Sequence, residues 1–280
     1  MNNVILGCLA DAGPFLDQAL RLIRSVRWFG GTVANSRFRI CLVDSVDLRY
    51  ASLFESYGAE LVVVPRYSEK AGVLNKLRFF QQPDVANYDH IVYLDCDTLM
   101  LRDPGSLARE QPVAARVAGL PTVPHVLFEK LFAHFGLSMP QQRLQCIVSR
   151  DLTIPYFNTG VLIIAGAVVS DLTNSWIRFA DALCDSEFMR GREQFTEQAA
   201  LTLALSETGV SMETLGPEMN FPVTGQTRAH LMDIDPLIVH YHGWVEPPGR
   251  IKLSGYPLVD ARIDRFNRRN AEETARYVRS

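Results

Sequence analysis

The first hundred residues alternate short β-rich runs with amphipathic stretches, and this alternation limits the possible fold more than any other feature. Residues 4–9, 38–43, 60–64 and 90–94 have the length and β-branched content of buried strands. The stretches between them have helical spacing. Strands joined by helices pair in parallel and carry helices on both faces of the sheet. The sequence therefore predicts an α/β fold with a mostly parallel sheet.

The stretch after the first predicted strand shows the helical period clearly. Its apolar positions repeat every three to four residues, opposite a polar back, and they are Phe15, Ala19, Leu22, Ile23 and Val26. We expect this stripe to face the core.

The second half of the chain is less regular. Residues 104–155 mix proline, glycine and aromatic residues, and we interpret them as an insertion that shapes a site, with a helix near residues 128–135. A buried strand is predicted at 156–164, amphipathic segments at 168–187 and 196–205, a strand at 237–242 and an Arg-rich tail at 259–278. With no internal repeat or linker, one domain spanning residues 1–280 is expected.

Composition excludes several classes of protein. A net charge of −3 provides no broad positive field for a nucleic-acid backbone. No apolar run approaches the roughly 20 residues that a membrane-spanning helix needs. The five cysteines are widely spaced and form no C-x-x-C pair, so a reducing cytoplasm is the expected setting. The first strand-to-helix turn, residues 9–15, also lacks the G-x-G-x-x-G of dinucleotide-binding oxidoreductases.

The strongest chemical signal is the segment IVYLDCDTLM, in which an apolar strand runs into Asp95, Cys96 and Asp97. Alternation along a strand places both carboxylates on one side. Ligands of open α/β sheets bind at the carboxyl ends of strands, and carboxylate oxygens are ligands for divalent cations. A second D-x-D triplet, Asp233 to Asp235, precedes a strand instead and is interpreted as a surface turn.

A second element, IVHYHG, ends an apolar strand in His240 and His242. A neutral imidazole completes the mixed carboxylate and nitrogen shell that Mn²⁺ accepts. A buried histidine that is only hydrogen-bonded in the core remains an alternative. The two side chains share a face, so at most one needs to be a ligand.

Taken in order, these motifs resemble the family-8 retaining glycosyltransferases, which include glycogenin and bacterial galactosyltransferases of lipooligosaccharide synthesis. The likeness covers most of the chain. Its matching segments are LNKLRFF at 74–80, IVYLDCDTLMLRDP at 91–104, YFNTGVLII at 156–164, EQAAL at 197–201, NFP at 220–222 and IVHYHG at 238–243.

The resemblance implies a GT-A type fold, with a nucleotide-sugar half at 1–103 and an acceptor-binding and sugar-binding half at 104–280. It implies a Mn²⁺ or Mg²⁺ ion, a UDP-sugar donor of glucose or galactose, and transfer with retained anomeric configuration. The metal ligands that it implies are Asp95, Asp97 and His240. The implied donor contacts are Leu9, Ala10, Asp11, Lys76 and Asp95, and the residues implied to face the transferred sugar are Asn158, Glu197 and Gln198.

The chain departs from the family pattern at one place. The lysine that grips the diphosphate after the metal histidine is replaced by Glu246, followed by Pro247 and Pro248. A carboxylate repels phosphate, so we expect Arg250 or Lys252 to supply the missing charge. The same departure motivates an alternative, a sugar-nucleotide-binding protein of this fold that has little or no turnover.

The acceptor is not identified by the sequence: a glycan, a lipid-linked sugar and a small molecule all remain open. We expect the 104–155 insertion and the C-terminal third to bind it, since such loops vary with substrate. In the Arg-rich tail, acidic residues are interleaved with the arginines, which favours a solvated helix face over contact with an anionic membrane surface.

Overall fold

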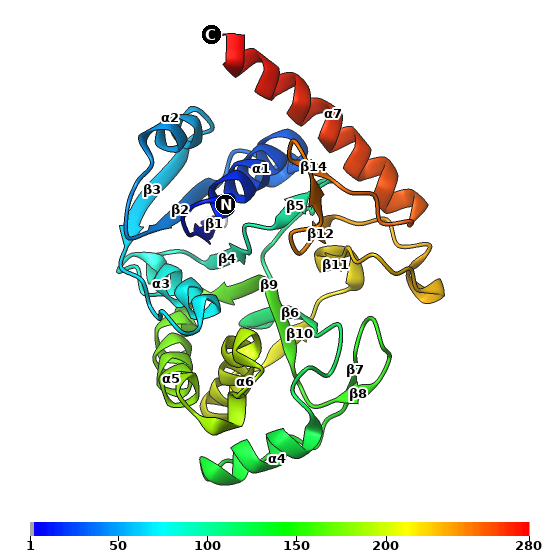
Figure 1. The fold of residues 1–280 in the computed structure, drawn as a ribbon. Helices are drawn as coiled ribbons and strands as arrows, with labels where there is room; N and C mark the ends of the chain where they lie inside the picture. The colour runs from blue at the N-terminus through cyan, green and yellow to red at the C-terminus, as the bar shows by residue number, and fades with distance from the viewer. Residues whose placement is uncertain (1–2, 280) are drawn as a thin grey trace.

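A computed structural model describes residues 3–279, and a seven-stranded sheet lies at its centre (Figure 1). The strand order is β10-β6-β9-β4-β1-β2-β3. Only β9 runs antiparallel to its neighbours, β4 and β6, so the sheet is mostly parallel as predicted. The strands span Val4–Ala10 (β1), Arg37–Val43 (β2), Ala59–Val64 (β3), His90–Leu94 (β4), Val113–Val117 (β6), Phe157–Ala165 (β9) and Met212–Thr214 (β10).

Helices cover both faces of this sheet (Figure 1). One face carries α3 (Leu77–Phe80), α5 (Gly166–Cys184) and α6 (Thr196–Thr208), and the other carries α1 (Pro14–Phe29) and α2 (Leu48–Ser56). Helix α4 (His125–His134) lies close to the helix predicted at 128–135. The last helix, α7, spans Pro257–Arg279. Within residues 3–279, no helix is long and apolar enough to cross a membrane.

A second, three-stranded sheet continues from the end of β4. Its order is β11-β12-β5, formed by Phe221–Pro222 (β11), Ile238–His240 (β12) and Thr98–Met100 (β5). Two small hairpins complete the strands: Leu144–Gln145 (β7) with Leu152–Thr153 (β8), and Val245–Glu246 (β13) with Arg250–Ile251 (β14). The path from β4 through Asp95 and Asp97 into β5 therefore joins the two sheets.

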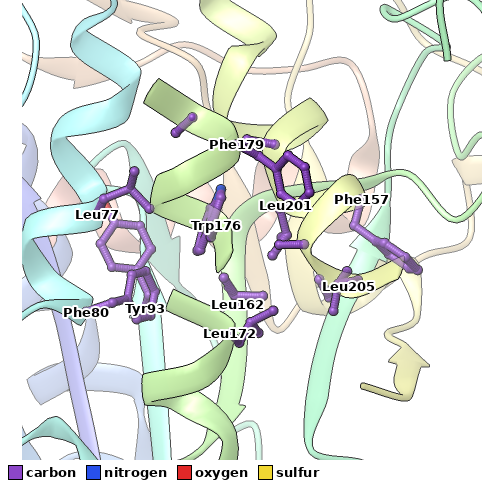
Figure 2. Packing of buried hydrophobic residues seen from close by; sticks show 14 of the residues in the cluster. Leu77, Phe80, Tyr93, Phe157, Leu162, Leu172, Trp176, Phe179, Leu201 and Leu205 are labelled. Carbon is purple, nitrogen blue, oxygen red and sulfur yellow. The ribbon is translucent and has the colours of Figure 1, made fainter. Parts of the chain in front are cut away.

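The core between the central sheet and helices α3, α5 and α6 is built around Trp176 of α5, which is fully buried. Figure 2 shows Trp176 between the aromatic side chains of Phe80 and Tyr93 and the aliphatic Leu201 of α6. The Trp176 ring centroid lies 5.5 Å from that of Phe80. Its indole Nε1 donates to the backbone carbonyl of Glu197 at 2.8 Å, which fixes the first turn of α6.

Two expectations are wrong in part. Phe15 is not in the core: its side chain is 44% exposed, and Leu16 and Leu20 are buried on α1 beside Ala19. Phe15 is the second residue of the helix, at the end of the apolar stripe, where its side chain is open to solvent. Residues 104–155 are not only an insertion, since they also supply β6, the second strand of the central sheet.

The Arg-rich tail packs against α1. Arg24 of α1 donates to Asn270 Oδ1 and Thr274 Oγ1 at 2.8 and 3.1 Å, and the guanidinium of Arg269 lies over the Trp28 ring. Arg262 pairs with Asp235 at 2.9 Å. Several arginines of this helix thus make contacts within the protein.

Candidate metal and donor site

Asp95 and Asp97 lie where β4 passes into β5, and backbone bonds hold the turn in place. The Asp95 amide donates to the carbonyl of Gly160 on β9 at 2.8 Å, and Thr98 Oγ1 donates to the Asp95 carbonyl at 2.8 Å. The neighbouring strand β12 sets His240 opposite Thr98. The Tyr241 amide donates to the Asp97 carbonyl at 3.0 Å. Elements 140 residues apart in sequence thus meet at one edge.

Asp97, His240 and His242 form a cluster whose ligand atoms all lie within 4.8 Å of one another. His240 Nε2 lies 2.9 Å from Asp97 Oδ1, and the two imidazole rings stack with centroids 3.8 Å apart. Although burial opposes ionisation, the His240 imidazole lowers the pKa of Asp97 to about 2. Desolvation and the adjacent His240 ring hold the pKa of His242 below its ordinary value.

This donor set fits a divalent transition-metal ion such as Mn²⁺, which accepts imidazole nitrogen together with carboxylate oxygen. An ionised carboxylate, which the lowered pKa of Asp97 favours, is the form that metal binding requires. We predicted Asp95, Asp97 and His240. Asp95 stands outside the cluster, with Oδ2 4.0 Å from His240 Nε2, whereas His242 is inside it.

Gly160 lies directly beside the imidazole of His240. A Cβ atom at this position would stand 2.4 Å from His240 Nδ1 and 2.9 Å from Asn158 Oδ1, closer than atoms can approach. The motif N-T-G of β9 therefore contains glycine because the metal-site histidine occupies the space of a side chain. His240 Nδ1 is buried and has no hydrogen-bond partner within the described residues.

Lys76 joins Asp95 to the start of α6 in a buried charge network. Its ammonium lies 2.9 Å from Asp95 Oδ1, 3.3 Å from Glu197 Oε1 and 2.9 Å from Thr159 Oγ1. Burial disfavours the charged ammonium, but the carboxylates of Asp95 and Glu197 outweigh this effect and raise the pKa of Lys76. The network therefore holds a protonated Lys76 beside Asp95 and Glu197.

Glu197 is 2% exposed, and Thr159 Oγ1 donates to its Oε1 at 2.6 Å. Burial raises the pKa of Glu197, although Lys76 and Thr159 act in the opposite direction. Its second oxygen, Oε2, is buried without a hydrogen-bond partner within residues 3–279. A buried carboxylate oxygen without a partner can accept a hydrogen bond from a hydroxyl group.

Asn158 and Gln198 differ in their settings. Asn158 Oδ1 accepts from the Gly160 amide at 3.0 Å and from Asn220 Nδ2 at 2.8 Å. Gln198 is half-buried on the first turn of α6, and its amide side chain forms no hydrogen bond with the described residues.

Asp95, Asp97 and Lys76 line a cavity of about 500 Å³, whereas Glu197 does not. Among the predicted donor contacts, Leu9, Asp11, Lys76 and Asp95 line it, whereas Ala10 is buried in the sheet. The remaining lining residues are Phe15, Gln18, Lys70, Ala71, Gly72, Val73, Asn75, Tyr93, Cys96, Asp97, Glu193 and Gln194.

Asp11, which lines this cavity, is held by Arg66, whose Nη1 lies 2.6 Å from Asp11 Oδ2. This hydrogen bond is the main cause of a lowered pKa for Asp11. Arg66 also contacts Asp44 at 3.1 Å. The Asp11 carboxylate is therefore fixed and ionised, and it acts only as a hydrogen-bond acceptor.

The other two predicted donor contacts lie elsewhere. Arg250, on β14, is 3.7 Å from Glu246 and 3.5 Å from Asp264, and the Lys252 ammonium lies 4.6 Å from the ring centre of Trp244. Neither lines the cavity. Both cations thus have protein partners in this structure.

Thr159 and Arg66 were missed from the sequence. Thr159 stands in the N-T-G motif, but alternation along a strand turns it away from Asn158, so the spacing gave no sign that it faces Lys76. Arg66 comes shortly after the strand β3, and nothing in the sequence distinguishes it from the other arginines of the chain. Only the folded chain shows that it faces Asp11, 55 residues away.

The fold is that of the GT-A glycosyltransferases. Solved structures of similar fold include the bifunctional glycosyltransferase WbbM (15% identity, TM-score 0.54, 94% of this chain and 50% of that one) and the galactosyltransferase LgtC (16%, 0.53, 94% and 93%). Mouse xyloside xylosyltransferase 1 is a third (13%, 0.53, 88% and 99%). The chain thus spans half the length of WbbM.

The family model for the Rhodobacterales glycosyltransferase domain matches residues 8–209, and the chain belongs to this family. The match contains Asp11, Lys76, the Asp95–Asp97 segment and Glu197, and ends before His240. No curated protein matches the chain in sequence.

Proposed function

We propose that this glycosyltransferase moves a hexose, glucose or galactose, from a UDP-sugar to a glycan, a lipid-linked sugar or a small-molecule acceptor in a metal-dependent reaction. The observation that carries the proposal is the cluster of Asp97, His240 and His242 beside a cavity that Asp97 itself lines. We also propose that the chain is related to the family-8 retaining glycosyltransferases. The UDP-sugar donor would bind in this cavity, most of whose lining residues belong to the 1–103 half.

Asp97 and His240 are the proposed metal ligands. His242, in the same cluster, and Asp95, just outside it, are the further candidates. A Mn²⁺ or Mg²⁺ ion bound there supplies Lewis-acid stabilisation of the charge on the leaving diphosphate. Lys76 orients Asp95 through their 2.9 Å contact.

In the same cavity, the ionised Asp11 carboxylate is the proposed acceptor for a donor N–H or O–H group of the nucleoside. Phe15, exposed on the first turn of α1, offers an apolar ring on the same wall. For the transferred sugar, Glu197 Oε2, Gln198 and Asn158 supply the mixed hydrogen-bonding groups that hydroxyls need.

We predict that Arg250→Ala and Lys252→Ala have unequal effects on UDP binding. If one of these cations contacts the diphosphate, its truncation weakens UDP binding about ten- to a hundredfold, which corresponds to roughly 1.5–3 kcal/mol for a charge-assisted contact. Calorimetry with UDP and Mn²⁺ measures the affinity. Equal, wild-type affinity of both variants would show that the β13–β14 hairpin does not contact the donor.

We predict that the product keeps the donor's anomeric configuration. An inverting enzyme needs a carboxylate that acts as general base for the acceptor, whereas Gln198 is an amide and Glu197 is held in the Lys76 network. A leaving-phosphate oxygen then takes the acceptor proton. Glu197→Gln is expected to lower turnover without abolishing it, because it loosens placement of the sugar. NMR of the anomeric proton of the product is the measurement, and an inverted signal contradicts the mechanism.

The test of the function itself is release of free UDP from UDP-glucose and UDP-galactose with Mn²⁺, with and without candidate acceptors. Turnover with an acceptor supports the transferase. Tight donor binding without turnover supports the alternative, a sugar-nucleotide-binding protein, for which the carboxylate at Glu246 is the motivating observation.

A further inference from the structure

Arg116, on β6, is a buried guanidinium that forms no ion pair with any residue from 3 to 279. Its side chain is 2% exposed, and its one hydrogen bond within the described residues runs from Nη1 to the carbonyl of Val117 at 2.8 Å. Nε is enclosed and has no partner. Burial without a carboxylate neighbour lowers the pKa of Arg116 to about 10.

Arg39 shows how this chain otherwise buries an arginine. It is equally buried, but its guanidinium contacts Asp84 at 2.6 Å and Glu60 at 2.9 Å. A buried charge without such partners destabilises a fold by several kcal/mol in general. Arg116 therefore reduces stability where a neutral side chain of similar size would not, which is typical of a residue retained for binding.

The position of Arg116 points to the substrates. It pairs with Asn158 across the β6–β9 register, at a break in the ladder near the carboxyl end of β6. Two residues earlier, Ala114 packs in the same hydrophobic cluster as Met219 and Ile238. Met219 precedes Asn220 in the sequence, and Ile238 begins the strand β12 that ends in His240. Ala115 and Val117, on either side of Arg116, both pack in the cluster on the opposite face, so Arg116 lies on the side of Ala114 despite the break.

Arg116 thus stands opposite Asn158, whose Oδ1 accepts from Asn220 and lies beside the space that Gly160 leaves for His240. Within the described residues, three buried polar atoms of these side chains lack partners: Arg116 Nε, Asn220 Oδ1 and His240 Nδ1. Buried polar atoms are almost always paired in folded proteins, so three together indicate a place where a polar ligand completes the set.

We infer that Arg116 binds an oxyanion of a substrate, either the diphosphate of the donor or an acidic group on the acceptor. This inference rests on the proposed function and extends it to the charge of what binds. A guanidinium suits both groups, because its fork of N–H donors matches phosphate and carboxylate oxygens. Arg250 and Lys252 already have protein partners, whereas Arg116 has none of opposite charge.

The test compares Arg116→Met with Arg39→Met, a matched variant that removes an equally buried guanidinium. Calorimetry with Mn²⁺ measures binding of UDP and of uridine, and then of glucuronate and glucose in the presence of UDP. If the diphosphate is the ligand, Arg116→Met weakens UDP binding at least about tenfold and leaves uridine binding unchanged. If an acidic acceptor is the ligand, the wild type prefers glucuronate to glucose, and Arg116→Met loses that preference.

Thermal unfolding of the same variants separates binding from structure. Arg116→Met should keep or raise the melting temperature, whereas Arg39→Met should lower it because two carboxylates lose their partner. If the methionine variant does not fold, Arg116→Gln, which keeps a donor for the Val117 carbonyl, carries the same measurement. Wild-type UDP affinity in the variant, with no preference of the wild type for glucuronate, overturns the inference. A wild type that does not bind UDP at all contradicts instead the proposed function.

Discussion

Replacing Asp97 with alanine is expected to reduce the Mn²⁺-dependent affinity for UDP at least about 100-fold. Changes to groups that only support a metal ligand typically cost 10- to 100-fold, and Asp97 is the one carboxylate inside the cluster with His240 and His242. Its 2.9 Å contact also orients the His240 ring. Calorimetry with UDP, with Mn²⁺ and after chelation, measures the loss.

The chain supplies a matched control for this variant. Asp233 belongs to the second D-x-D triplet and is exposed on the surface, so Asp233→Ala should leave UDP affinity and metal dependence unchanged. Comparing His240→Ala with His242→Ala then decides which imidazole is the ligand. An Asp97→Ala protein with wild-type affinity and metal dependence would refute the metal assignment.

Replacing Lys76 with methionine is expected to destabilise the fold by about 3–5 kcal/mol, the usual cost of breaking a buried ion pair. The variant leaves the 3% exposed side chain of Glu197 and the partly buried Asp95 without their shared cation. Urea unfolding at neutral pH measures the change in the free energy of unfolding.

Two further variants isolate the cause. Adding Glu197→Gln to Lys76→Met removes the uncompensated buried carboxylate and should recover much of the loss. Lys70→Met removes an exposed pair with Asp185, whose side chains are 72% and 70% exposed, and should cost at most about 1 kcal/mol. A loss of the same small size in Lys76→Met would mean that solvent already screens the network.

The sheet was predictable because its strands read as separate apolar runs with helices between them. Strand β6 was missed, since the run Val113–Val117 is short, contains an arginine and lies among proline and glycine residues. Phe15 was misplaced for a related reason: helical period identifies the stripe of a helix, but not whether its first turn is covered by the rest of the fold.

The candidate site divides in the same way. The sequence predicted that Asp97 and His240 meet, because both end apolar strands at the carboxyl edge. It did not predict that Lys76 bridges Asp95 and Glu197, because such a pairing depends on how α6 packs. The i, i+2 spacing of His240 and His242 indicated that they share a face, but not that both would lie beside Asp97 while Asp95 stays outside the cluster.

The anchoring of α6 by Trp176 gives the protein an optical signal of its own. One of three tryptophans in the chain, Trp176 is fully buried, and its indole is bonded to the carbonyl of Glu197. Trp244, two residues after His242, is instead 37% exposed beneath Lys252. Emission from the first is blue-shifted and follows the start of α6, whereas quenching by iodide selects the second. Two sides of the site can therefore be followed separately by fluorescence, without any attached dye.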